Sequence, residues 1–227
     1  MTDYVEFLTS LPHLHDPFRY RRPPISAVQL RKRFRMLAPE DQRLMERLWE
    51  NVLWSSIPLA TDDQELVERF EHVLAEVSDP QLCGWLHWRM DVRTVLAALR
   101  RRQSGQSAPG AGKRWGLGNL PLLIARNWNQ PGFGLLGRFP WLAEAEQYLA
   151  DGESLALEKC VLQQVWNYYS RCEADQTNGF AAVFLYVSRW DICHRWSSYD
   201  HEHGLKRFDR LVEESVQVAG INFEEWN

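Results

Sequence analysis

The sequence predicts an all-α protein, a multi-helix bundle. Two observations predict this class: apolar residues recur with the 3.6-residue period of amphipathic helices along most of the chain, and helix-capping residues or prolines separate these stretches. No alternating apolar–polar pattern is long enough to require a sheet. The 227 residues, of which 45% are hydrophobic and 25% charged, have the composition of a globular protein with a buried core.

The first part of the chain contains four predicted helices after its opening segment. The opening YVEFLTSLP, residues 4–12, predicts either a short strand or a helical turn. Each of the four helices follows or begins with a residue that favours a helix start: Ser26, Pro39, Asp62 and Asp79. Asp62 with Glu65 also resembles a capping box. The fourth helix is expected to run to about Arg102, where three arginines suit the negative end of the helix dipole.

A stretch rich in glycine, serine, proline and alanine, residues 103–119, predicts a flexible linker. It divides the chain into an N-terminal helical part, residues 1–102, and a C-terminal helical part, residues 120–227. The two parts form either separate domains or one continuous domain.

The C-terminal part is expected to be helical as well. Short helices are predicted around 119–128 and 139–150, and a long one over 153–172. Residues 180–199 begin with a run that is apolar nearly all round, which predicts a centrally buried helix. A polar turn at about 200–202 and a separate last helix over 203–218 are expected to follow.

Two rare residue types bear on the interior and on location. The chain contains 11 tryptophans, which are expected mostly in the core and otherwise at protein interfaces. Its four cysteines form no CxxC pair and lie at no zinc-ligand spacing, so buried free thiols in a reducing compartment are expected.

The opening segment lacks the features of a signal peptide, and no stretch of 18 uncharged apolar residues occurs. We therefore expect a cytoplasmic protein, peripheral to a membrane only through a complex.

The motifs that resemble nucleotide-binding or metal-binding sites do not have the residue spacing that such sites need. In PGAGKR a phosphate loop would need glycine where Ser107 stands and a hydroxyl where Arg114 stands, so no nucleotide site is expected. His13 with His15, and His201 with His203, are two residues apart, which points paired ligands to different sides of a helix.

No enzyme signature remains elsewhere. Asp191 and Arg195, four residues apart on one predicted helix, are expected to pair on its surface, or, if that helix is buried, to dock it or to face a partner. The sequence thus predicts no catalytic, cofactor-binding or metal-binding residues, and a protein that is not itself an enzyme.

A basic run is the strongest electrostatic feature of the chain. The stretch 19–35 contains no acid and seven cations, which are the predicted partner-binding residues: Arg19, Arg21, Arg22, Arg31, Lys32, Arg33 and Arg35. It is interpreted as a solvated helix face, as a surface for an acidic protein, or as a nucleic-acid site where Tyr20 and Phe34 stack on bases. The net charge of −4 disfavours a general nucleic-acid binder.

Three segments together resemble a bacterial family encoded among the subunits of V/A-type rotary ATPases. They are YVEFLTSLP at 4–12, WLHWRMDVRTVLAALRRR at 85–102, and the stretch 180–214 that begins FAAVFLYVSRWDICHRW. The family is similar to the central-stalk C subunit (eukaryotic d). The helix with Trp88, Arg89, Asp91 and Leu96 resembles the aromatic-Arg-x-Asp helices that recur in that subunit.

The resemblance implies a shortened, all-helical C/d-type scaffold that couples the rotor shaft to the membrane ring of a proton- or sodium-transporting complex. It implies no catalysis and no cofactor. The expected function is therefore that of a non-catalytic accessory or central-stalk subunit. The alternative is a helical adaptor that uses the basic run 19–35 to bind nucleic acid or an acidic partner.

Overall fold

The computed structural model describes residues 4–56, 62–110, 112–173 and 178–219, with side chains as far as Tyr199. This described part is all-helical and contains no strand, which confirms the predicted all-α class. Its α-helices are α1 (Val5–Thr9), α2 (Ala27–Arg33), α3 (Pro39–Asn51), α4 (Asp63–Glu76), α5 (Pro80–Gln103), α6 (Leu120–Arg126), α7 (Leu142–Ala150), α8 (Ser154–Glu173) and α9 (Phe180–Ala219). The short 3₁₀ helices are η1 (Pro17–Arg19), η2 (Phe34–Met36), η3 (Trp54–Ser56) and η4 (Pro131–Gly134). No helix in the described ranges is long and apolar enough to cross a membrane.

The helices of the first half begin where the sequence predicts. The Ser26 hydroxyl accepts a hydrogen bond from the Gln29 N–H at 3.2 Å, and the Gln29 side chain completes a capping box. Pro39 is the first residue of α3, and Asp62 and Asp79 cap α4 and α5 through their carboxylates. Glu65 does not complete a capping box with Asp62, because it pairs with Arg69 one turn further on. These caps satisfy backbone N–H groups that the first helical turn leaves without partners.

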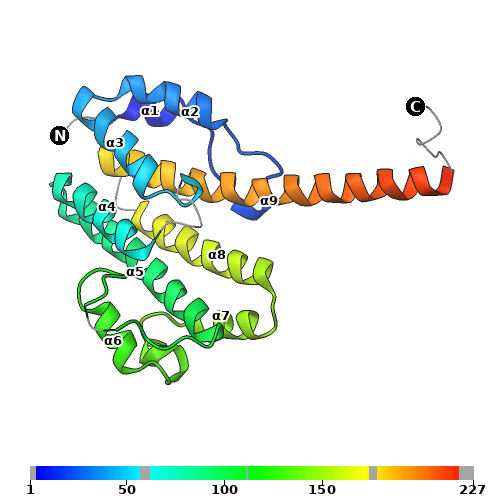
Figure 1. Ribbon diagram of the computed structural model, residues 1–227. Helices are drawn as coiled ribbons and strands as arrows, with labels where there is room; N and C mark the ends of the chain where they lie inside the picture. The colour runs from blue at the N-terminus through cyan, green and yellow to red at the C-terminus, as the bar shows by residue number, and fades with distance from the viewer. Residues whose placement is uncertain (1–3, 57–61, 111, 174–177, 220–227) are drawn as a thin grey trace, which may run out of the picture.

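Helix α9 is the axis of the fold (Figure 1). Helices α1–α3 lie on one side of α9, and α8 lies along its other side (Figure 1). Helix α5 lies beyond α8 and leads to α6 and α7, which form the end of the molecule farthest from α1–α3 (Figure 1). The first turns of α9 are apolar all round and are enclosed by these neighbours: Val183, Phe184, Leu185, Val187 and Trp190 are fully buried. The predicted central helix over 180–199 is therefore confirmed.

One continuous cluster of buried residues contains side chains from both predicted parts of the chain. The linker 103–119 contributes to it, because Trp115 and Leu117 are buried. Residues 103–107, in contrast, are exposed. The second half of the linker is thus anchored to the core, and its flexibility stays a prediction for the first half.

Helix α9 differs from the prediction in its length. The expected polar turn after Tyr199 is absent, and a single helix runs from Phe180 to Ala219. The stretch contains no proline, and Gly204 is its only glycine, so nothing stops a helix that is already nucleated from propagating. The later turns of α9 extend well beyond the rest of the protein (Figure 1).

Candidate functional sites

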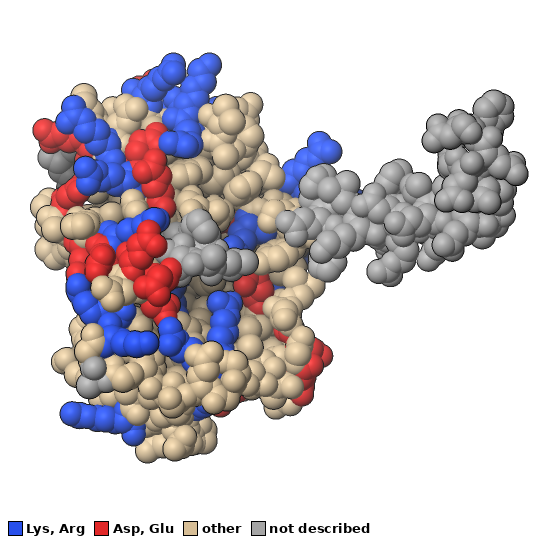
Figure 2. Space-filling model, in the orientation of Figure 1, with Lys and Arg blue, Asp and Glu red and all other residues tan. Residues whose placement is uncertain are grey.

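The predicted basic run lies on η1, α2 and η2 and on the segment that joins η1 to α2. Leu30 and Phe34 are fully buried and fix which face of α2 points inward. Six of the seven cations are exposed and Arg33 is half-buried. In Figure 2, Lys and Arg side chains lie along the upper edge of the molecule, where α2 lies in Figure 1, and also further down the same face. We call the seven cations the basic surface.

Three of these cations already have partners within the protein. Arg19 lies 3.4 Å from Asp16, Arg31 pairs with Glu46 of α3, and Arg33 donates to the Gln29 carbonyl at 3.2 Å. The other four have no hydrogen bond or ion pair among the described residues: Arg21, Arg22, Lys32 and Arg35. These four are the cations most available to a partner.

Two exposed apolar side chains complete this surface. Val28 is 78% exposed and Met36 is 40% exposed, and both lie on the solvent side of α2 and η2 with Lys32 between them. Phe34 cannot stack on bases, because its ring is fully buried, and the Tyr20 hydroxyl accepts a hydrogen bond from the His15 N–H. The predicted aromatic platform for nucleic acid is therefore wrong in its Phe34 half. A surface of exposed cations around apolar side chains suits an acidic protein partner.

The tryptophans contribute to the interior. Ten of them have described side chains, five buried and five half-buried, and none of these ten is exposed. The core interpretation of the tryptophans therefore fits the described residues better than the interface interpretation.

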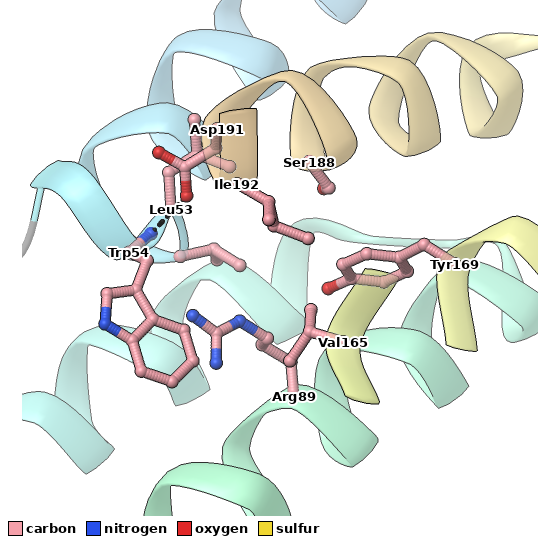
Figure 3. Close-up of a pocket in the computed structure, with 9 residues that line it drawn as sticks. Leu53, Trp54, Arg89, Val165, Tyr169, Ser188, Asp191 and Ile192 are labelled. Carbon is pink, nitrogen blue, oxygen red and sulfur yellow. Dashed lines mark hydrogen bonds between the residues drawn. The ribbon is translucent and has the colours of Figure 1, made fainter. Parts of the chain in front are cut away.

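A second site, which the sequence did not predict, is a buried polar cluster between α5, α8, α9 and η3 (Figure 3). Asp191 of α9 is 3% exposed and accepts hydrogen bonds from the Trp54 N–H at 2.7 Å, the Ser55 N–H at 3.3 Å and the Ser55 hydroxyl. A single carboxylate thus holds the backbone of η3 against α9.

The surface pair between Asp191 and Arg195 does not form, and the alternative, in which these residues dock a buried helix, agrees with the structure. Asp191 faces η3, and Arg195 instead pairs with Glu158 of α8. The reason is burial: both side chains lie against neighbouring elements and not on an open helix face. Asp191 makes its side-chain hydrogen bonds to residues far away in the sequence, whereas Arg195 also donates to the Tyr199 hydroxyl one turn further along α9 at 3.0 Å.

Arg89 of α5 is the least compensated member of this cluster. It is 3% exposed, and its guanidinium stacks 3.9 Å from the centre of the Trp54 ring. Its Nη1 has no hydrogen-bond partner among the described residues. Burial lowers the pKa of Arg89, and the nearby Tyr169 and Asp191 partly offset that effect. Together with Leu53, Tyr169, Ser188 and Asp191 it lines a small cavity (Figure 3).

Among the residues that the structure describes, the other motifs form neither a metal cluster nor a strand–loop–helix phosphate site. The described residues contain no group of three or more His, Cys, Asp or Glu that could hold a metal ion, and the side chains of His201 and His203 lie outside the described ones. Gly112 and Lys113 lie in an exposed loop that follows helix α5, whereas a phosphate loop follows a strand.

No disulfide joins the four cysteines, all of which lie in the described part of the chain, and two of them are buried. Burial raises the pKa of Cys160 and of Cys193 to about 12 in each case. Only on the order of 10⁻⁴ of such a thiol is ionised at pH 8, and the thiolate is the reactive form. We expect Ellman's reagent to leave both unmodified in the native protein at pH 8 and to modify both in guanidinium. Mass mapping of the labelled cysteines tests this, and rapid native labelling at either position would contradict it.

Comparison of the chain with protein-family models, curated proteins and solved structures found no match to any of them.

Proposed function

We propose that this protein is a non-catalytic accessory or central-stalk subunit of a bacterial V/A-type rotary ATPase, and that it binds the other subunits through the basic surface. The observation that carries the proposal is spatial: the three segments that resemble the ATPase-associated family pack against one another around the start of α9.

The contacts between these segments are specific. The Tyr186 hydroxyl of α9 donates to the Pro12 carbonyl at 2.8 Å, which joins the third segment to the first. Trp85 of α5 and Phe184 of α9 stack with ring centres 6.5 Å apart and planes within 10°, which joins the second to the third. These contacts support the proposal, because the three similar segments form one structural unit and are not scattered over separate parts of the protein.

The architecture supports a role in binding. A body of packed helices, from which the later turns of α9 extend, has the form expected of a subunit that connects partners (Figure 1). Among the described residues the basic surface combines free cations with exposed Val28, the most exposed large apolar side chain. Such a surface is expected to draw an acidic partner by long-range attraction and to retain it by apolar contact.

Affinity purification from the organism that encodes the protein tests the proposal. We expect the wild-type chain to recover V/A-type ATPase subunits, identified by mass spectrometry. Reversing the four unpaired cations of the basic surface to glutamate should reduce that recovery by about tenfold or more at low salt. Arg31 and Arg33 are left unchanged because their internal contacts would also be lost. The variant carries Arg21→Glu, Arg22→Glu, Lys32→Glu and Arg35→Glu.

A matched control reverses four exposed cations elsewhere that have no ion pair among the described residues: Arg100, Lys113, Arg126 and Arg171. It changes the net charge by the same amount and should retain the ATPase subunits. Failure of the wild-type protein to recover any of them would refute the proposal. Recovery of nucleic acid with a steep salt dependence would favour the adaptor alternative instead.

A further inference from the structure

The stretch 103–143, which includes α6 and η4, contains no acid. It contains four cations, Lys113, Arg114, Arg126 and Arg138. Three acids reach it from α4, α5 and α7, and each of them is paired with an arginine: Glu71, Asp91 and Glu146. A part of the surface with this composition favours a negatively charged partner.

Helix α6 carries apolar side chains on its outer face as well as on its inner face. Leu120 and Ile124 are buried and fix which face points inward. Leu122 and Leu123 are 56% and 42% exposed, and Leu136, in the turn after η4, is exposed as well. A helix at the surface of a globular protein normally carries polar residues on its outer face. The outer face of α6 is thus apolar where solvent would favour polar side chains.

Two cations lie beside these exposed leucines. Arg126 follows Leu122 by four residues and therefore lies on the same face of α6, and Lys113 lines one groove together with both. Glu71 also lines this groove, but it is paired with Arg114. The side chains of Lys113 and Arg126 have no hydrogen bond or ion pair among the described residues. We call Leu122, Leu123, Lys113 and Arg126 the tip surface.

The tip surface lies apart from the basic surface. Helix α6 is at the end of the molecule farthest from α1–α3, whereas the basic surface lies on α2 and its flanking segments (Figure 1). In Figure 2 this lower end is mostly tan, with Lys or Arg side chains at its left edge.

We propose that the tip surface binds a membrane surface that contains anionic lipids. Leu122 and Leu123 enter the boundary between the headgroups and the acyl chains, and Lys113 and Arg126 contact the lipid phosphates. The composition of 103–143 suits this partner, because a carboxylate that faced anionic headgroups would be repelled.

The exposed side chains fit lipid better than protein or nucleic acid. The centres of protein interfaces are enriched in Trp, Tyr and Arg, and leucine is under-represented there. Single-stranded nucleic acid stacks on exposed aromatic rings. The aromatic side chains of this stretch are all buried or half-buried: Trp115, Trp128, Phe133, Phe139 and Trp141. What the tip surface offers is aliphatic and cationic, the combination that an anionic bilayer binds.

Flotation of the full-length protein with lipid vesicles in a density gradient tests the proposal. At low salt we expect the protein to float with vesicles of phosphatidylcholine that contain about 30% phosphatidylglycerol, and to stay at the bottom with pure phosphatidylcholine. Leu122→Gln with Leu123→Gln changes only exposed side chains and should lower the partition coefficient about tenfold or more. Lys113→Gln with Arg126→Gln should lower it about tenfold, and high salt should weaken wild-type binding several-fold.

Each pair of substitutions has a matched control that should float like the wild-type protein. Val28→Gln with Leu155→Gln removes two exposed apolar side chains elsewhere, and Arg22→Gln with Lys32→Gln removes two free cations of the basic surface. Circular dichroism checks that every variant keeps its helices.

Three outcomes would overturn the proposal. The wild-type protein does not float with the anionic vesicles, the leucine variant floats as well as the wild type, or the basic-surface control loses flotation while both tip variants keep it. Dimerisation of a wild type that does not float, abolished by the leucine variant, would assign the tip surface to a second copy instead. The vesicles contain no ATPase subunit, so the result does not depend on the proposed function.

Discussion

Replacing Asp191 with alanine is expected to lower the free energy of unfolding by about 3–5 kcal/mol, the usual cost of removing one partner from a buried charged network. The substitution removes the acceptor of three hydrogen bonds from Trp54 and Ser55. It also removes a carboxylate whose charge stabilises the buried Arg89. Both losses occur in a region that water enters poorly, so solvent cannot take over the role of the carboxylate.

Urea denaturation followed by circular dichroism measures this effect. Asp191→Asn should lose less than Asp191→Ala, because the amide oxygen can still accept a backbone N–H while the charge is gone. The control is Asp151→Ala, at an exposed aspartate whose side chain accepts a hydrogen bond from Gln147, and it should change stability by at most about 0.5 kcal/mol. If the alanine variants at 191 and 151 unfold at the same urea concentration, the carboxylate of Asp191 does not hold η3 as described.

The sequence predicted the helices because their signals are local. A cap such as Ser26 or Asp79 acts on N–H groups two or three residues away, and an apolar stripe repeats every turn, so both can be found without knowing the fold. The end of α9 was predicted less well. The polar residues after Tyr199 suggested a turn, yet polar residues do not stop a helix that contains no proline.

The candidate sites show where local signals end. The cations of the basic surface could be found in the sequence as a run of positive charges. Their exposure could also be expected, because the apolar face of α2 packs inward and leaves the cationic face in solvent. The pair between Arg31 and Glu46 and the burial of Phe34 depend on how α3 packs, which the run does not encode.

The partners within the buried cluster could not be predicted from the sequence for the same reason. Asp191 meets Trp54 and Ser55 across more than 130 residues of sequence, and Arg195 meets Glu158 across 37. The spacing of Asp191 and Arg195 favoured a local pair that tertiary packing overrides. The sequence contains one relevant signal, an aspartate and two arginines inside an otherwise apolar helix. Charged side chains in a buried helix need charged or polar partners, but the sequence does not show which residues these are.

Replacing Trp190 with alanine is expected to cost about 3–5 kcal/mol, as for large aromatic side chains removed from a close-packed core. Trp190 is fully buried, its ring lies 5.2 Å from that of Trp49 and stacks 4.9 Å from that of His194, and its Nε1–H donates to the Ile25 carbonyl at 2.8 Å. It therefore connects α9 to α3 and to the segment just before α2, which carries the basic surface.

Two further variants separate packing from hydrogen bonding in this loss. Trp190→Phe keeps most of the apolar volume but leaves the Ile25 carbonyl unpaired, so about 1–3 kcal/mol should be lost. Trp128→Phe, at a half-buried ring 5.3 Å from Phe133, should cost about 1 kcal/mol or less. Guanidinium denaturation followed by circular dichroism compares the three without relying on tryptophan fluorescence. A Trp190→Ala protein that unfolds together with the Trp128→Phe control would show that α9 is not joined to α2 and α3 through this ring, and the basic surface would then need another support.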